Sequence, residues 1–465
     1  MGTTRELAEF MTEVTFDDLP ADVVHEGRQL ILESLAVTIL GGRLELGRTL
    51  AAGQGFVDVR YALGDAANPQ SLRNAAFVNA AWADCNDSAG GSYKSVFHPG
   101  KNLLPAVLTV GIAEDRSGEE VILAAMAATE CSFRIDFAIG LEHMARGHYT
   151  DGTVGTIGTA LAIGKLRGLS VEQLEAAIGN AALLAPATVG GVGMWSASGR
   201  PAALGQAAAS GIYAVELAQA GIEGPADVLE RDGGFAHALG GTNNLERVTR
   251  DIGDVWECLD YYLKPYVGCK LTHPAREGLQ KLKREDGLTA EDVASISVSH
   301  PLYDIAVIGH HTDADANAVA ASCSAPYLMA TSLIYDDLGP ESLLGHRIAD
   351  PAVRELAARI EIVEDVALTK LYEPGIEARG DIGTPIRMEV TLRTGKTLTY
   401  IANHAKGDPV DGLEVTDDEL DKKFRDYVEG VLDNDQVLTI IELVHGFERC
   451  DSMKALREEL VTPNS

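Results

Sequence analysis

The stretch 201-PAALGQAAASGIYAVELAQAG-221 has the pattern of a helix and is built mostly from small residues. A helix that is apolar or small on every side is typical of a large buried helical core. Residues 5 to about 260 continue in the same way, helix after helix. One helix is predicted over 21–40, ending at Gly41-Gly42. Another is predicted over 171–185, after a capping box of Ser170 and Gln173.

The pattern changes near residue 290, where alternating runs predict strands over 294–300 and 359–365. The segment 385–402 predicts a hairpin centred on Thr394-Gly395. Helical segments over 322–335 and 353–359 lie between these strands. A second capping box, of Thr416 and Glu419, then predicts a helix over 420–432.

This order predicts a mainly α fold with an α+β second domain. A large helical domain is expected from both chain ends, residues 1–264 and 403–465, with a smaller α+β insert over 265–402. At 465 residues, the chain is also too long for one ordinary core.

Composition narrows the classes of partner. The formal charge of −31 argues against binding to nucleic acid or to anionic membranes. The most apolar stretches are interrupted before they could span a bilayer, so no membrane partner is expected. The N-terminus shows no apolar signal segment, and six scattered cysteines without a CxxC pair predict reduced thiols and a cytoplasmic location. An anionic substrate would need a local cluster of bases.

The segment 84-DCNDSAGGSYKSVFHPGKN-102 carries the first candidate site. A helix continued to Asp84 would place that carboxylate on a small apolar face, with Asp87 one turn further. Two close carboxylates in poor solvent raise at least one pKa. His98 is held in extended geometry by the following proline, and Lys101 adds positive charge. A solvated helix end is the alternative, and the residues alone leave the choice open.

Several motifs resemble those of the MmgE/PrpD family, in the same order and spacing, from about residue 22 to 455. They are Asn79, 84-DCNDS-88, His98-Pro99, 104-LPA-106, 155-GTIGTALAIGKLRGL-169, 205-GQAAASGIYAVELAQAGIEGP-225, the set Lys264, Cys269 and His273, and Tyr327 in 324-SAPYLMA-330. The resemblance implies a helical domain with a smaller α+β domain, a homodimer, and no cofactor. It also implies an active site lined by Asp84, His98, His273 and Tyr327.

Two positions depart from the family pattern. Tyr149 falls where relatives have a histidine, with His148 one position early. Arg200 replaces a lysine, and because arginine stays protonated it can clamp a carboxylate but is a poor general acid. Arg146 is a further candidate for anion binding.

The family's chemistry moves a proton at a carbon near a carboxylate, which needs a base, an acid and positive charge. We assign His98 as the base, oriented by Asp84, and Tyr327 or His273 as the acid. The substrate carboxylates are assigned to Arg200 and Lys264.

The first expectation is a cofactor-independent lyase, a dehydratase or decarboxylase, for a small di- or tricarboxylic acid. An epimerase of a small dicarboxylate of the iminodisuccinate type is the runner-up, with Tyr149 facing His98. A family member that binds carboxylates without catalysis is a third possibility. A metal site in 309-GHHTDADAN-317 is weighed against a solvated loop, and the loop is preferred, so no metal is predicted.

Overall fold

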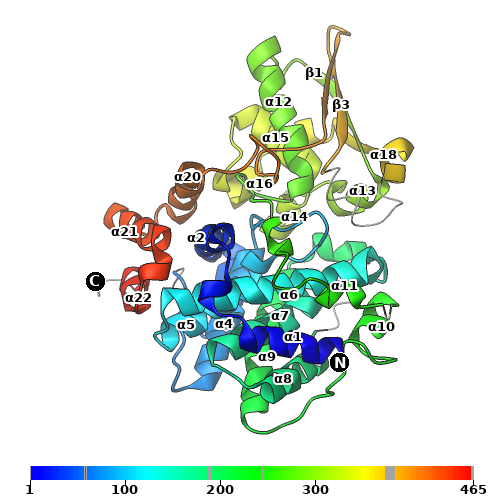
Figure 1. The fold of residues 1–465 in the computed structure, drawn as a ribbon. Coiled ribbons are helices and arrows are strands. Elements are labelled where there is room, and N and C mark those ends of the chain that lie inside the picture. The colour runs from blue at the N-terminus through cyan, green and yellow to red at the C-terminus, as the bar shows by residue number, and fades with distance from the viewer. Residues whose placement is uncertain are drawn as a thin grey trace.

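The chain is mainly helical, with one small mixed sheet, as predicted (Figure 1). The computed structural model describes residues 2–56, 58, 60–186, 191–242, 244–371 and 383–461. The helices of the first part are α1 Thr3–Glu13, α2 Ala21–Arg43, α3 Glu45–Ala52, α4 Pro69–Asp84, α5 Leu103–Ala113, α6 Gly118–Ala145, α7 Thr150–Leu166, α8 Val171–Leu184, α9 Arg200–Gln219, α10 Phe235–Gly240 and α11 Glu246–Thr249.

Small residues allow the central helices to touch. A Cβ placed on Gly205 of α9 would lie 2.6 Å from the carbonyl oxygen of Phe77 in α4. A Cβ on Gly211 would lie 2.5 Å from the Cβ of Thr159 in α7. Helix α9 therefore packs between α4 and α7 at a distance that larger residues would prevent. This confirms the buried helical core predicted from the 201–221 stretch.

Helix α2 runs to Arg43, so the predicted end at Gly41-Gly42 is wrong. A Cβ on Gly41 would lie 1.8 Å from the carbonyl oxygen of Trp82, because α2 and α4 cross there in backbone contact. The glycine serves close packing, which local sequence pattern cannot distinguish from a helix stop.

The sheet has the order β2-β1-β3-β4. Strand β1 pairs parallel to β2 and antiparallel to β3, and β3 pairs antiparallel to β4. Gly395 takes a positive φ of 88° in the turn between β3 and β4, as the predicted hairpin requires. The elements of this part are α12 His273–Asp286, β1 Val293–His300, α13 Leu302–Ile308, α14 Ala318–Ser322, α15 Ala325–Tyr335, α16 Gly345–Ile348, α17 Pro351–Ala357, β2 Ile360–Glu364, α18 Val366–Leu371, β3 Ile386–Leu392 and β4 Thr397–Ala402.

The last helices return to the first part of the chain (Figure 1). They are α20 Asp417–Val428, α21 Asn434–His445 and α22 Lys454–Leu460. Both predicted capping boxes are present, Thr416 with Glu419 and Ser170 with Gln173. A buried ion pair of 2.7 Å joins Lys423 of α20 to Glu33 of α2. The C-terminal block is thus fixed to the second helix of the protein.

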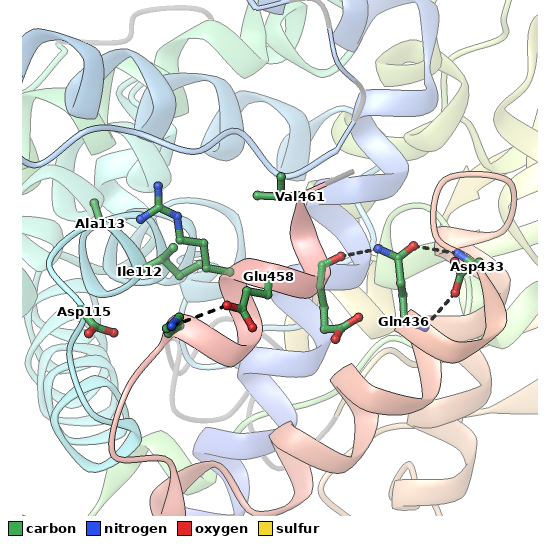
Figure 2. A pocket seen from close by; sticks show the side chains of 10 residues that line it. Ile112, Ala113, Asp115, Asp433, Gln436, Glu458 and Val461 are labelled. Atoms are coloured by element: carbon green, nitrogen blue, oxygen red, sulfur yellow. Dashed lines mark hydrogen bonds and ion pairs between the residues drawn. The ribbon is translucent and has the colours of Figure 1, made fainter. Parts of the chain in front are cut away.

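One hollow lies between the end of α5 and helices α21 and α22 (Figure 2). Several of its polar groups pair with one another: Gln436 bonds to Asp433, and Lys454 lies 3.9 Å from Glu458. It is lined by Ile112, Ala113, Asp115, Asp433, Gln436, Lys454, Arg457, Glu458, Glu459 and Val461. This set includes none of the residues predicted to carry chemistry.

Candidate active site

A second pocket is lined by three of the ten predicted site residues, His98, Lys101 and Lys264. It is formed by the loop between α4 and α5, by the segment before α12, and by one face of α13. The cavity between its walls is narrow, with a volume of about 60 Å³. It is lined by Asp87, Ser92, Tyr93, Ser95, Val96, His98, Lys101, Trp195, Tyr262, Lys264, Cys269, Lys270, Leu271, Tyr303 and Val307.

His98 is held at the pocket by Asp151, in the first turn of α7. The backbone N–H of His98 donates to Asp151 Oδ1 at 2.6 Å, and the ring Nδ1 lies 3.1 Å from Oδ2. The other ring nitrogen, Nε2, lies 3.5 Å from the hydroxyl oxygen of Tyr262. The prediction that Asp84 orients His98 is therefore wrong, because Asp84 is engaged with other partners described below.

Burial lowers the pKa of His98, and the charge of Lys101 lowers it further, although Asp151 opposes both. Burial would raise the pKa of Asp151, but His98 and Lys101 hold it below its usual value. The pair is thus a neutral imidazole beside a carboxylate near neutral pH. An ionised carboxylate only accepts hydrogen bonds, so Nδ1 carries the proton and Nε2 keeps its lone pair.

A second carboxylate, that of Asp136 in α6, forms hydrogen bonds with the same loop. Its Oδ2 accepts hydrogen bonds from the Ser95 hydroxyl at 2.5 Å and from the Val96 backbone at 2.8 Å. Burial raises the pKa of Asp136 to about 6. The loop that carries His98 therefore rests on two buried acids.

Asp84, the last residue of α4, is fully buried and is bound by Arg200. The guanidinium places Nε 2.8 Å from Oδ2 and Nη2 3.2 Å from Oδ1, which is a bidentate pair. Lys101 Nζ and the Tyr149 hydroxyl each lie 3.4 Å from Oδ1. Arg200 was predicted to clamp a substrate carboxylate, but here its fork holds a carboxylate of the chain itself.

Asp87 sits in the left-handed region, with a φ of 49°, and pairs with two lysines. Lys101 Nζ forms a short ion pair with Oδ1, while Lys264 Nζ donates to the Asp87 carbonyl at 2.8 Å. Burial would raise the pKa of Asp87, but Lys101, Lys264 and Arg200 outweigh it and hold the pKa well below its usual value. The rise expected from two adjacent carboxylates is therefore not found at Asp87, because the nearby cations were not visible in the local sequence.

A third lysine, Lys270, reaches the pocket from the segment before α12. Its Nζ lies 2.8 Å from Asp408 Oδ1 and 5.4 Å from the ring centre of Tyr262. The Tyr93 hydroxyl donates to the same Asp408 oxygen at 2.9 Å. This part of the wall is built by residues more than 300 positions apart in the sequence.

Seven predicted site residues do not line this pocket: Asp84, Tyr149 and Arg200 form the buried cluster described above, and the other four lie elsewhere. His273 is buried at the start of α12 and bonds to the Gly268 carbonyl at 3.3 Å. The Tyr327 hydroxyl donates to the Ser342 carbonyl inside the α+β part. Arg146 is half-exposed and pairs with Glu142 at 3.0 Å. His148 stacks on His143 with ring centres 5.0 Å apart, and Tyr149, not His148, reaches Asp84.

Within the described ranges, no three histidine, cysteine or acidic side chains are grouped so that they could hold a metal ion. In the 309–317 segment, His310 Nε2 donates to the Ala320 carbonyl at 3.0 Å. Among the described residues, no helix is both long enough and apolar enough to cross a bilayer.

Sequence reasoning missed Asp151, Lys270 and Asp408. Asp151 occurs in 146-RGHYTDG-152, where an acid in the first turn of a helix also has an ordinary explanation, the helix dipole. A signal was nevertheless present, because α7 is otherwise composed of apolar, glycine and threonine residues up to Lys165. No local sequence pattern predicts that Lys270 and Asp408 form an ion pair.

Comparison with known proteins agrees with the motifs quoted above. The model for the MmgE/PrpD N-terminal domain matches residues 5–248, and the model for the C-terminal domain matches residues 266–449. Cis-aconitate decarboxylase from Aspergillus terreus is 25% identical over 494 residues, covering 99% of this chain and 96% of that protein. The cis-aconitate decarboxylase-like protein oryM of Aspergillus oryzae is 25% identical, covering 96% and 95%. Cis-aconitate decarboxylase from Mus musculus is 22% identical, covering 100% and 94%. The chain belongs to the MmgE/PrpD family.

Proposed function

We propose that the protein is a lyase that acts on a small di- or tricarboxylic acid, with decarboxylation as the first choice. The observation that carries this proposal is the meeting of three buried lysines and the His98–Asp151 pair at one small pocket. The names of the relatives, cis-aconitate decarboxylases, favour decarboxylation over dehydration.

The lysines supply the positive charge that a carboxylate needs. Lys101 and Lys264 are each 1% exposed, and both pair with Asp87. An ammonium group has three N–H donors, so each lysine retains a donor after meeting its aspartate. A substrate carboxylate placed at this wall would complete their hydrogen bonding in a poorly solvated site.

Decarboxylation would break the bond between a carbon and its carboxylate, releasing CO2 and leaving an electron pair on that carbon. The pair would be delocalised into an adjacent unsaturated bond or carboxylate held by a lysine. A proton must then be returned to carbon, and His98 is the group assigned to deliver it in its protonated form, with Asp151 stabilising the imidazolium. These steps use only residues of the chain.

Dehydration would use the same residues in the opposite protonation state. Neutral His98 would remove a proton from the carbon beside a carboxylate while hydroxide leaves the neighbouring carbon. The two reactions therefore predict opposite dependences on pH. Because the pKa of His98 lies below its ordinary value of 6.5, kcat/KM for decarboxylation should fall as pH rises through that pKa. For dehydration, kcat/KM should rise over the same interval.

The first experiment is proton NMR in D2O with a panel of di- and tricarboxylic acids. Loss of substrate with new alkene or methylene signals would identify a lyase and its substrate. Deuterium entering beside a carboxylate without net loss would identify an epimerase instead. No change with any acid, together with thermal stabilisation by one of them, would indicate a binding protein. Size-exclusion chromatography with light scattering tests the expected homodimer.

A further inference from the structure

Lys270 is placed to do more than complete an ion pair. Its side chain is 2% exposed and lies on the wall of the proposed active site. Within the described part of the chain, two acceptors lie within hydrogen-bond distance of its ammonium, Asp408 Oδ1 at 2.8 Å and the Lys406 carbonyl at 2.7 Å. One of its three donors is left for a group inside the pocket.

The partner of Lys270 is shared among several donors. Asp408 Oδ1 also accepts from Tyr93, while Oδ2 accepts from the Ala405 backbone at 3.1 Å and lies 3.1 Å from His404 Nδ1. Asp408 therefore has several partners besides Lys270, and the third N–H donor of Lys270 can still meet an anion in the pocket.

Lys264 lies close enough to influence Lys270. Burial lowers the pKa of Lys270, the charges of Asp408 and Glu277 oppose this, and the charge of Lys264 lowers the pKa further. Two ammonium groups that repel each other across a buried pocket are stabilised by an anion placed between them. The pocket thus offers positive charge at two places, the Lys101–Lys264 wall beside Asp87 and the Lys270 wall beside Asp408.

We infer that Lys270 is a specificity-determining residue that binds a second carboxylate of the substrate, so that the pocket selects acids with at least two carboxylates. This inference rests on the proposed function and adds which residue distinguishes dicarboxylates from monocarboxylates. With Lys101 and Lys264 holding one carboxylate, a monocarboxylate would leave the Lys270 ammonium without an anionic partner from the ligand. Lys270 would then keep Asp408 as a counter-charge, but its remaining N–H donor would be unfilled, so a monocarboxylate should bind more weakly than a dicarboxylate.

The test is calorimetric titration of the full chain with propane-1,2,3-tricarboxylate, glutarate and butyrate. Lys270→Met should weaken binding of the first two by about 10- to 100-fold, the usual effect of losing one charge-assisted contact, and should change butyrate binding by less than about threefold. Lys270→Arg should restore part of the affinity. Lys283→Met is the matched control, because Lys283 also pairs with an aspartate, Asp336, at 3.4 Å, but away from the pocket.

The outcomes separate this inference from the proposed function. Equal weakening of all three acids by Lys270→Met, or no weakening, would overturn the role of Lys270 and leave the proposed function standing. Failure of the unaltered protein to bind any polycarboxylate would overturn both. If Lys270→Met does not fold, Asp408→Asn decides: it keeps the ammonium and removes its counter-charge, so glutarate should bind at least as tightly. Weaker glutarate binding by that variant would overturn the inference.

Discussion

The carboxylate of Asp151 binds His98 twice, through the backbone N–H at 2.6 Å and through the ring Nδ1 at 3.1 Å. One acid thereby fixes both the position of the loop and the rotation of the imidazole. It also leaves Nε2 directed to the side of Tyr262, which lines the pocket. A histidine on a loop thus gains the orientation that a catalytic base or acid requires.

Replacing Asp151 with asparagine should lower kcat by about 10²-fold, because the charge that stabilises the imidazolium is lost. Asp151 raises the pKa of His98, so in the variant the pH at which kcat/KM changes with His98 protonation should be lower. Steady-state kinetics across pH 5–8 would measure both effects. Asp421→Asn, which breaks the His445–Asp421 pair of 2.8 Å far from the pocket, should leave kcat unchanged. An unshifted limb in Asp151→Asn would show that His98 is not the titrating group.

Arg200 should matter more for folding than for substrate affinity. Arg200→Met leaves Asp84 buried without its bidentate partner, and loss of one member of such a pair costs about 3–5 kcal/mol. Arg200→Lys keeps the charge but not the fork and should cost less. Urea denaturation would give both unfolding free energies. A large rise in KM with unchanged stability would instead mean that Arg200 binds the substrate.

The Glu33–Lys423 pair should support stability and activity together. Glu33 also accepts from Tyr261 at 2.8 Å and from the Gly90 backbone at 2.9 Å, and Lys423 donates to the Ser88 carbonyl at 2.9 Å. Lys423→Met should therefore reduce the unfolding free energy by about 3–5 kcal/mol and disturb the loop that carries Asp87. The neighbouring Lys422, which is 73% exposed, provides the control variant Lys422→Met, with little expected change.

A double variant tests whether Glu33 and Lys423 stabilise the fold through a direct interaction. The double variant Glu33→Gln with Lys423→Met should be more stable than Lys423→Met alone, because it removes the unpaired buried carboxylate. Strictly additive losses in the double variant would contradict a direct interaction.

Glu26 should make stability depend on pH. Burial, with Glu33 and Asp417, raises its pKa from 4.5 to about 8, so the folded protein keeps a proton that the unfolded chain releases. This contribution to stability is present below pH 4.5 and is lost as pH rises towards 8. Glu26→Gln should therefore raise Tm more at pH 8 than at pH 5. The exposed Glu223→Gln should show no such difference, and an equal gain at both pH values in Glu26→Gln would contradict the raised pKa.

Local pattern was sufficient for most elements of the fold. Capping boxes at Ser170 and Thr416 and the hairpin at Gly395 depend on residues a few positions apart, and all three were predicted. Gly41 was misread because its reason, the backbone of Trp82, is distant in the sequence.

The site residues likewise include some that the sequence predicted and some that it did not. His98 and Lys264 were chosen from family motifs and Lys101 from its place beside His98, and all three line the pocket. The choice of Asp84 as the partner of His98 was wrong, because tertiary packing, not sequence proximity, sets the distance from a helix end to a side chain in the following loop. Lys270 and Asp408 carry no local signal, since each acquires its environment only when the α+β part meets the segment after β4.

The Glu33–Lys423 contact also orders events while the protein is being made. Glu33 leaves the ribosome early, and its cation follows only after the whole α+β part has been synthesised. Until Lys423 has been made, neither Glu33 nor the Ser88 carbonyl can have its contact with that ammonium. The pocket loop is therefore completed by one of the last helices to emerge, which couples assembly of the site to nearly complete translation of the chain.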